Sequence, residues 1–299
     1  MGRVTAEPNN IVHTLAGHAL RGNVFGNDIS VTTALTRPAR SFSIEAMAQP
    51  MIIATHSYRG GTGKSNVSAN LALELARSGH RVGVVDTDLP SPGVHILFAQ
   101  DQPPTTVNGV LYRHYGVDKA MIDVTPAELG GDGRIWLLAG SPKPGDIAQI
   151  VKEGYALEQL IDIYRDFCKA AALDFLFVDT HPGINETTLM SITVADLLLM
   201  LLRPDRQDYQ GTAVTVDVAR KLGVPALRFV VNKAITSLDW PNLKTTIEQT
   251  YGDQCLAILP QSDEIMRYGG NGLFCLQQPD HPLSVALREV AQSIAALRS

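Results

Sequence analysis

A glycine-rich stretch contains the residues whose types and spacing most clearly indicate chemistry. It is Arg59-Gly-Gly-Thr-Gly-Lys-Ser65, preceded by an apolar run and followed by a helical pattern. Three glycines in four residues let backbone N–H groups crowd around an anion, which a Cβ would obstruct. Lys64 supplies a mobile positive charge for phosphates, and Ser65 places a hydroxyl where a phosphate-bound Mg²⁺ would lie. The stretch therefore predicts a phosphate-binding loop at a helix start, whose dipole favours the same anion.

The loop departs from the ordinary P-loop pattern, because Tyr58 occupies the position that needs a glycine five residues before Gly63. With its paired glycines and preceding basic residue it resembles the MinD/ParA family of P-loop ATPases, whose loop reads Lys-Gly-Gly-x-Gly-Lys-Ser/Thr. The resemblance implies ATP and Mg²⁺ as cofactors. The nucleotide-binding residues that it implies here are Gly60, Gly61, Thr62, Gly63, Lys64, Ser65 and Asn66.

Arg59 stands where the family has its signature lysine. In the family this lysine reaches the partner's nucleotide across a dimer that sandwiches two ATP molecules. We expect Arg59 to make the same contact with its planar guanidinium, which suits phosphate. The alternative is a solvated side chain that leaves the contact across the dimer weak.

Carboxylates follow two apolar runs that we expect to be strands. Asp86 and Asp88 follow residues 81–85, and Asp179 follows residues 175–178. Ligands of parallel α/β sheets bind beyond these strand ends, so the carboxylates suit Mg²⁺ or an attacking water. The resemblance implies that Asp88 acts on the water together with catalytic Lys64 and Arg59. It assigns Ser65, Asp86 and Asp179 to Mg²⁺ binding, with Asp86 supporting the ion indirectly.

Three later positions also match the family's pattern. The family commonly reads Asp-x-Pro-Pro-Gly where this chain reads Asp179-Thr-His-Pro-Gly183. Gly183 is expected to meet the γ-phosphate through its N–H, and His181 is a spacer or a pH-sensitive group. Asn232, after an apolar run, is expected to bind the adenine edge, and Pro260 to pack on the base.

Composition bounds the remaining possibilities. Hydrophobic residues make up 45% of the 299 residues and the net charge is −5, which does not indicate general nucleic-acid or membrane binding. The three cysteines are far apart, without a Cys-x-x-Cys, which argues against a zinc ribbon or redox motif and fits a reducing cytoplasm. The longest apolar run is too short to span a membrane.

The periodicity predicts one ATPase domain over residues 51–299. About seven strands alternate with helices, which indicates an α/β fold with a single doubly wound, mostly parallel sheet and helices on both faces. Residues 101–133 are expected to be largely irregular and to lie over the active-site edge. Residues 1–50 show no period, so they are either a disordered extension or an overrun before a natural start near Met47 or Met51.

The expected function is that of a cytoplasmic ATPase switch that positions or partitions a cargo. The resemblance implies a homodimer with ATP and slow hydrolysis stimulated by an unidentified protein partner. Two alternatives are a scaffold with negligible turnover and a small-molecule synthetase with a second pocket near residues 101–133. The cysteine spacing argues against the family's iron–sulfur carriers. DNA binding is possible but not favoured, and the last helix has too few basic residues to favour membrane docking.

Overall fold

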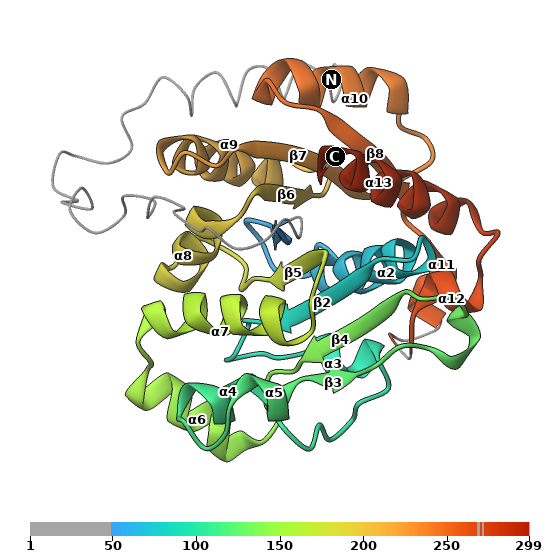
Figure 1. Ribbon diagram of the computed structural model, residues 1–299. Helices are drawn as coiled ribbons and strands as arrows, with labels where there is room; N and C mark the ends of the chain where they lie inside the picture. The colour runs from blue at the N-terminus through green and yellow to red at the C-terminus, as the bar shows by residue number, and fades with distance from the viewer. Residues whose placement is uncertain (1–48, 268–269, 271, 299) are drawn as a thin grey trace, which may run out of the picture.

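An eight-stranded sheet forms the centre of the molecule in the computed structural model, which describes residues 49–267, 270 and 272–298 (Figure 1). The strand order is β3-β4-β2-β5-β1-β6-β7-β8, and every neighbouring pair is parallel except β3 with β4. The strands are β1 Met51–His56, β2 Arg81–Asp86, β3 Ile122–Asp123, β4 Arg134–Leu138, β5 Phe175–Asp179, β6 Leu197–Leu202, β7 Ala226–Ala234 and β8 Cys255–Pro260. The predicted doubly wound α/β fold is confirmed. The prediction for residues 1–50 lies outside the described residues, except for positions 49 and 50.

The central strands are apolar along their whole length because helices cover both faces of the sheet. In β6 all six residues are buried. Leu197, Leu199 and Leu201 join one core cluster, whereas Leu198, Met200 and Leu202 join another. Successive side chains therefore point to opposite, equally covered faces, as is typical of parallel sheets.

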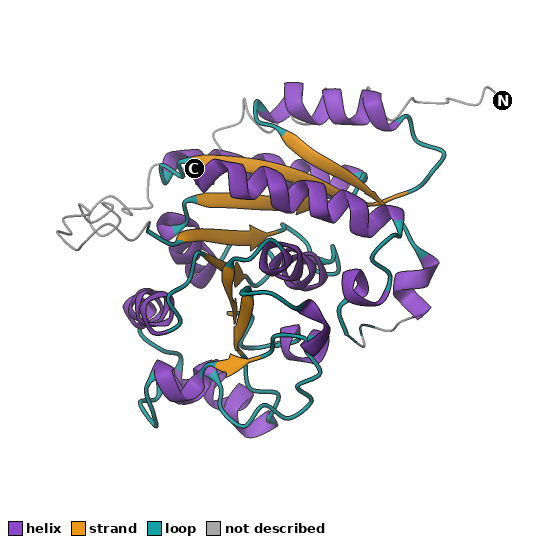
Figure 2. Ribbon diagram, turned by 45° about the vertical axis from the view of Figure 1, so that its right-hand side comes forward, coloured by secondary structure: helices purple, strands orange, loops and turns teal. Residues whose placement is uncertain are grey.

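The helices form a layer on each side of the sheet (Figure 2). Their bounds are α2 Lys64–Arg77, α3 Val94–Leu97, α4 Val107–Leu111, α5 Val117–Ala120, α6 Pro144–Glu153, α7 Leu157–Ala170, α8 Glu186–Val194, α9 Arg206–Lys221, α10 Trp240–Tyr251, α11 Asp263–Arg267, α12 Phe274–Gln277 and α13 Pro282–Arg298. The helices α2, α12 and α13 bury their apolar residues against one face, and α7, α8, α9 and α10 against the other. The last helix, α13, is a core helix, as expected.

Two elements differ from the sequence prediction. The eighth strand is β3, a two-residue strand antiparallel to β4 inside the region 101–133. That region also contains α4, α5 and a short 3₁₀ helix at Ala127–Leu129. Helix α6 was not predicted; it begins at Pro144, and proline is common at the first position of a helix. The apolar residues Ile147, Ile150 and Val151 have helical spacing, so a signal was present, although Ile150 is the only residue of α6 that is buried.

The strand order creates a switch point at β1. From β1 the chain crosses to β2 on one side of the sheet, and it later adds β6 on the other side. Ligands of open α/β sheets bind beyond the carboxyl ends of the strands at such a point. The glycine loop after β1 lies there. Within the described residues, no helix is both long and apolar enough to cross a membrane.

Candidate nucleotide-binding site

The glycine loop joins β1, which ends at His56, to α2, which begins at Lys64. Gly61 and Gly63 have φ angles of 73° and 95°, in the left-handed region that favours glycine. A Cβ on Gly63 would lie 2.5 Å from the Asn232 amide nitrogen. Gly63 is the N-cap residue of α2, and no side chain caps this end of the helix. The first N–H groups of α2 therefore stay available to an anion. This geometry fits the predicted phosphate loop.

Ser65 and Asp179 form the contact expected of a magnesium site. Ser65 Oγ donates to Asp179 Oδ2 at 2.6 Å. The other carboxylate oxygen of Asp179 is buried and has no hydrogen-bond partner among the described residues. No group of three or more His, Cys, Asp or Glu side chains in the described chain is placed to hold a metal alone. Mg²⁺ commonly binds one or two carboxylates together with phosphates and waters, so the pair fits a nucleotide-borne Mg²⁺.

Asp86 lies beside Asp179, because the two residues are register partners on β2 and β5. Burial and the neighbouring Asp179 raise the pKa of Asp86 to about 8. Burial raises the pKa of Asp179 to about 6, against the opposing effect of Lys64. Asp86 also accepts hydrogen bonds from the N–H groups of Gly93 at 3.0 Å and Val94 at 3.2 Å. Its carboxylate thus organises the loop after β2, which is compatible with the predicted outer support of the metal.

Asp88, the predicted hydrolytic residue, faces His181. The distance from Asp88 Oδ1 to His181 Nε2 is 3.8 Å. His181 Nδ1 lies 2.6 Å from the carbonyl oxygen of Pro182 and 3.2 Å from the side-chain nitrogen of Asn185, and these two contacts fix the position of the ring. Burial raises the pKa of Asp88, while His181 and Lys64 act in the opposite direction. The structure therefore places His181 next to the residue expected to act on water.

Two other residues predicted to contact the nucleotide, Gly183 and Pro260, already have partners within the chain. The Gly183 N–H donates to the Ser57 carbonyl oxygen at 3.1 Å, so a γ-phosphate contact requires this bond to break. Pro260 ends β8 and is paired with Ala234 of β7. Both residues lie at the carboxyl edge of the sheet, but the predicted nucleotide contacts stay predictions.

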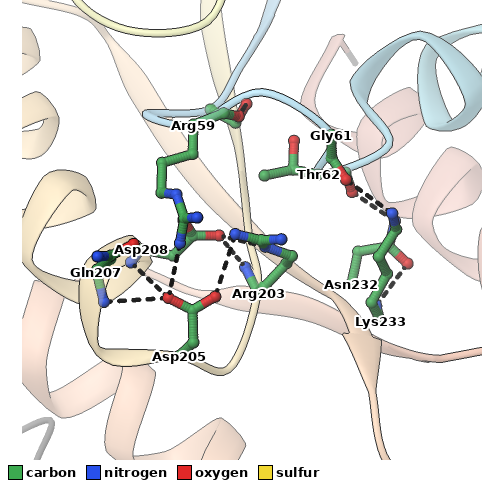
Figure 3. A network of polar contacts seen from close by, with 10 residues as sticks. Arg59, Gly61, Thr62, Arg203, Asp205, Gln207, Asp208, Asn232 and Lys233 are labelled. Atoms are coloured by element: carbon green, nitrogen blue, oxygen red, sulfur yellow. Dashed lines mark hydrogen bonds and ion pairs between the residues drawn. The ribbon is translucent and has the colours of Figure 1, made fainter.

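Asn232 and Lys233, near the end of β7, both contact the glycine loop (Figure 3). Asn232 Nδ2 donates to the Thr62 carbonyl oxygen at 2.8 Å. Lys233 Nζ donates to the Gly61 carbonyl oxygen at 2.7 Å. The amide of Asn232, predicted to bind adenine, is thus engaged with the loop.

Arg59 forms ion pairs within its own chain (Figure 3). Its Nη1 lies 3.2 Å from Asp205 Oδ1, and its Nε lies 3.7 Å from Asp208 Oδ1. Arg203 Nε lies 3.1 Å from the other oxygen of Asp208. Arg59 is therefore not simply solvated, and its contact with a partner's nucleotide stays a prediction.

Sequence reasoning missed Arg203, Asp205, Asp208 and Lys233 as parts of this site. The first three follow β6 and Lys233 lies near the end of β7, so their position at the carboxyl edge was the available signal.

Comparison with known proteins identifies the family. A family model described as "ParA: NUBPL iron-transfer P-loop NTPase" matches residues 49–295. The chain belongs to the MinD/ParA family of P-loop NTPases. An uncharacterized ATP-binding protein of Methanocaldococcus jannaschii is 25% identical over 250 residues, which cover 81% of this chain and 86% of that protein. The iron-sulfur cluster carrier protein of Deinococcus radiodurans is 28% identical over 254 residues, covering 82% of this chain and 69% of that protein.

A solved member of the MinD/ParA family has the same fold. The septum site-determining protein MinD of Pyrococcus horikoshii, solved with Mg-ADP, has a TM-score of 0.70 at 19% identity. The match covers 84% of this chain and 99% of that one. P-loop NTPases of this family bind nucleotide with Mg²⁺.

The cysteines bear on the iron-transfer description of the family model. The chain has three cysteines, Cys168 on α7, Cys255 at the start of β8 and Cys275 on α12, and all are buried. Burial raises their pKa values to about 12, 11 and 11. Metal ligation needs thiolates, so these side chains are poorly suited to hold an iron–sulfur cluster.

Proposed function

We propose that the protein is a dimeric ATP-dependent switch that binds Mg·ATP and hydrolyses it slowly. The observation that carries the proposal is the Ser65–Asp179 contact at 2.6 Å beneath the glycine loop, with Asp88 nearby at the same sheet edge. Loop N–H groups and Lys64 bind the phosphates. Ser65 and Asp179 hold Mg²⁺, which neutralises charge on the phosphate oxygens when bound.

Asp88 acts on the attacking water in this proposal. Its carboxylate accepts a hydrogen bond from the water and orients it, while Lys64 and the loop stabilise charge on the transferred phosphoryl group. Arg59 leaves Asp205 and binds phosphate at the dimer contact. A protein partner stimulates hydrolysis, and the two nucleotide states position or partition a cargo. The fold shared with a septum site-determining protein supports a positioning role.

The decisive experiment is the molar mass of Asp88→Ala by light scattering, with Mg·ATP and with Mg·ADP. We expect the mass to double only with ATP, because hydrolysis is blocked and the ATP dimer accumulates. A monomer with bound ATP contradicts the switch. If the wild type dimerises with ATP but shows no turnover with any partner, the scaffold alternative replaces the enzyme. Turnover that depends on an added metabolite favours the synthetase.

A second candidate function is iron–sulfur cluster transfer, which the family description and the Deinococcus relative favour. The buried, separated cysteines argue against it. Anaerobic reconstitution with iron and sulfide, followed by iron analysis and absorption spectroscopy, tests it directly. We expect no bound cluster. A cluster that is lost when the three cysteines are changed to serine would establish the carrier function instead.

A further inference from the structure

The end of β7 holds two consecutive carbonyl groups of the glycine loop. Asn232 binds the carbonyl of Thr62, and Lys233 binds the carbonyl of Gly61. The Lys233 N–H in turn donates to Asn232 Oδ1 at 2.9 Å, which fixes the orientation of that amide (Figure 3). The loop is thus held at two adjacent peptide units by two adjacent residues.

This arrangement determines where the loop N–H groups point. In a trans peptide the carbonyl and the N–H of one unit point in opposite directions. Because the Gly61 and Thr62 carbonyls point to β7, the N–H groups of Thr62 and Gly63 point away from it. A side chain at Gly63 would displace Asn232, since its Cβ would lie 2.5 Å from the amide nitrogen.

The backbone of Lys233 is strained where it makes this contact. Its φ is 58°, a left-handed conformation that costs free energy for any residue with a Cβ. The side chain is exposed, so burial of its stem does not offset that cost. Strain of this kind concentrates at functional sites. Within the part of the chain that the structure describes, the amine of this strained residue contacts the glycine loop alone.

We propose that Asn232 and Lys233 are positioning residues that aim the loop N–H groups at the nucleotide phosphates. The inference rests on the proposed function, in that a nucleotide binds the loop. It assigns Asn232 to loop support instead of recognition of the adenine edge. The loop N–H groups of P-loops cradle the α- and β-phosphates. Loss of either residue should therefore weaken the binding of ATP and ADP by the same factor. It should also weaken the binding of ATP and GTP by the same factor.

The test measures nucleotide affinity by calorimetry for a matched set of variants of the full chain. Lys233→Gln is expected to raise the Kd for ATP and ADP by the same factor, about fivefold for one lost hydrogen bond. Lys233→Arg keeps a donor and is expected to restore affinity. Lys233→Gly relieves the strain, so it should lose affinity while resisting unfolding at least as well as wild type. Lys152→Gln, an exposed lysine on α6, is the control.

Hydrogen exchange of the nucleotide-free protein gives a readout that needs no bound ligand. Peptides covering residues 57–66 should exchange faster in Lys233→Gln and Asn232→Ala than in wild type and Lys152→Gln. Unchanged exchange and affinity in both variants would overturn the proposal. So would an Asn232→Ala protein that loses ATP but not GTP, because Asn232 would then recognise the base. If wild type binds no nucleotide, the proposed function fails. The exchange result still tests whether Asn232 and Lys233 hold the glycine loop.

Discussion

The side chains around Arg59 differ in burial, and this difference sets what each contributes. Asp205 is 41% exposed as a side chain, whereas Asp208 is 2% exposed. An exposed ion pair contributes little because water and salt screen it. A buried carboxylate that pairs with an arginine is costly to replace, because the partner charge is left uncompensated. Arg59 lies nearer to the exposed Asp205 than to the buried Asp208, so the free-energy cost of releasing Arg59 is low.

We expect Asp208→Asn to lower the free energy of unfolding by about 2 kcal/mol, because Arg203 loses its buried carboxylate partner and keeps only the exposed Asp205, 3.3 Å away. Asp205→Asn should cost less than about 1 kcal/mol, since asparagine keeps the N-cap of α9 and only an exposed charge is removed. Urea denaturation of the two variants measures both values. Equal losses would contradict the argument that burial makes Asp208 the more important of the two carboxylates.

At the scale of elements, two adjacent strand ends force carboxylates together. Asp86 of β2 and Asp179 of β5 are register partners, so the sheet itself sets their proximity. Without a cation their charges oppose each other and burial opposes both. The folded, metal-free protein therefore holds protons that the unfolded chain releases. The paired carboxylates destabilise the metal-free protein, and the same pair forms a site that favours a bound cation.

The pH dependence of stability follows from the pKa of Asp86, which rises from 3.8 to about 8 on folding. The folded state binds the extra proton between these values, so stability is greatest at low pH and falls as pH rises towards 8. Asp86→Asn cannot titrate. Unfolding measured without nucleotide or metal should show that the variant loses about 4 kcal/mol less stability from pH 5 to pH 8 than wild type, because each pH unit between the two pKa values is worth about 1.4 kcal/mol.

The exposed Asp132→Asn is the control for that pH series. It should follow the wild-type curve throughout. A steeper loss of stability in Asp86→Asn than in wild type would contradict the raised pKa. Addition of Mg·ADP to wild type should recover more stability at pH 8 than at pH 5, because at pH 8 Asp179 is ionised and about half of the Asp86 carboxyl groups carry charge.

For the whole molecule, the final helix closes the core beneath the helix that follows the glycine loop. Leu287 of α13 lies in the same cluster as Leu71 and Leu75 of α2. Arg288 also pairs with the buried Glu74 of α2 at 3.0 Å. The start of α2 carries the site, so α13 supports the site from a distance through packing.

Leu287→Ala should lower the free energy of unfolding by about 3 kcal/mol, because the residue is 1% exposed and its loss leaves a cavity. Val285→Ala changes a residue of the same helix that is 39% exposed and should cost about 0.5 kcal/mol or less. Chemical denaturation of the two variants measures both losses. Leu287→Ala reports core packing, and Val285→Ala reports the effect of a substitution on the exposed side of the helix. Similar losses in both would indicate that α13 is not packed as described.

Local signals predicted much of this molecule. The β1–loop–α2 unit and the carboxylates at strand ends follow from spacing and apolar runs within short windows. The contact of Arg59 with Asp205 joins residues 146 apart, and that of Lys233 with Gly61 joins residues 172 apart. Only the order β1-β6-β7 brings these segments together, and no local pattern specifies that order. Helix α6 was missed although Ile147, Ile150 and Val151 have helical spacing.

The buried cysteines also make the protein a convenient host for a single spectroscopic label. Native thiols that are enclosed and have pKa values near 11 or 12 form little thiolate, so they should react slowly with maleimides or Ellman's reagent. We expect all three to react only on unfolding. A cysteine introduced at Ile235, which is 51% exposed just beyond β7, would then be the dominant reactive thiol. A dye at that position would lie two residues from Lys233, which contacts the glycine loop, and would report nucleotide binding without prior removal of native cysteines.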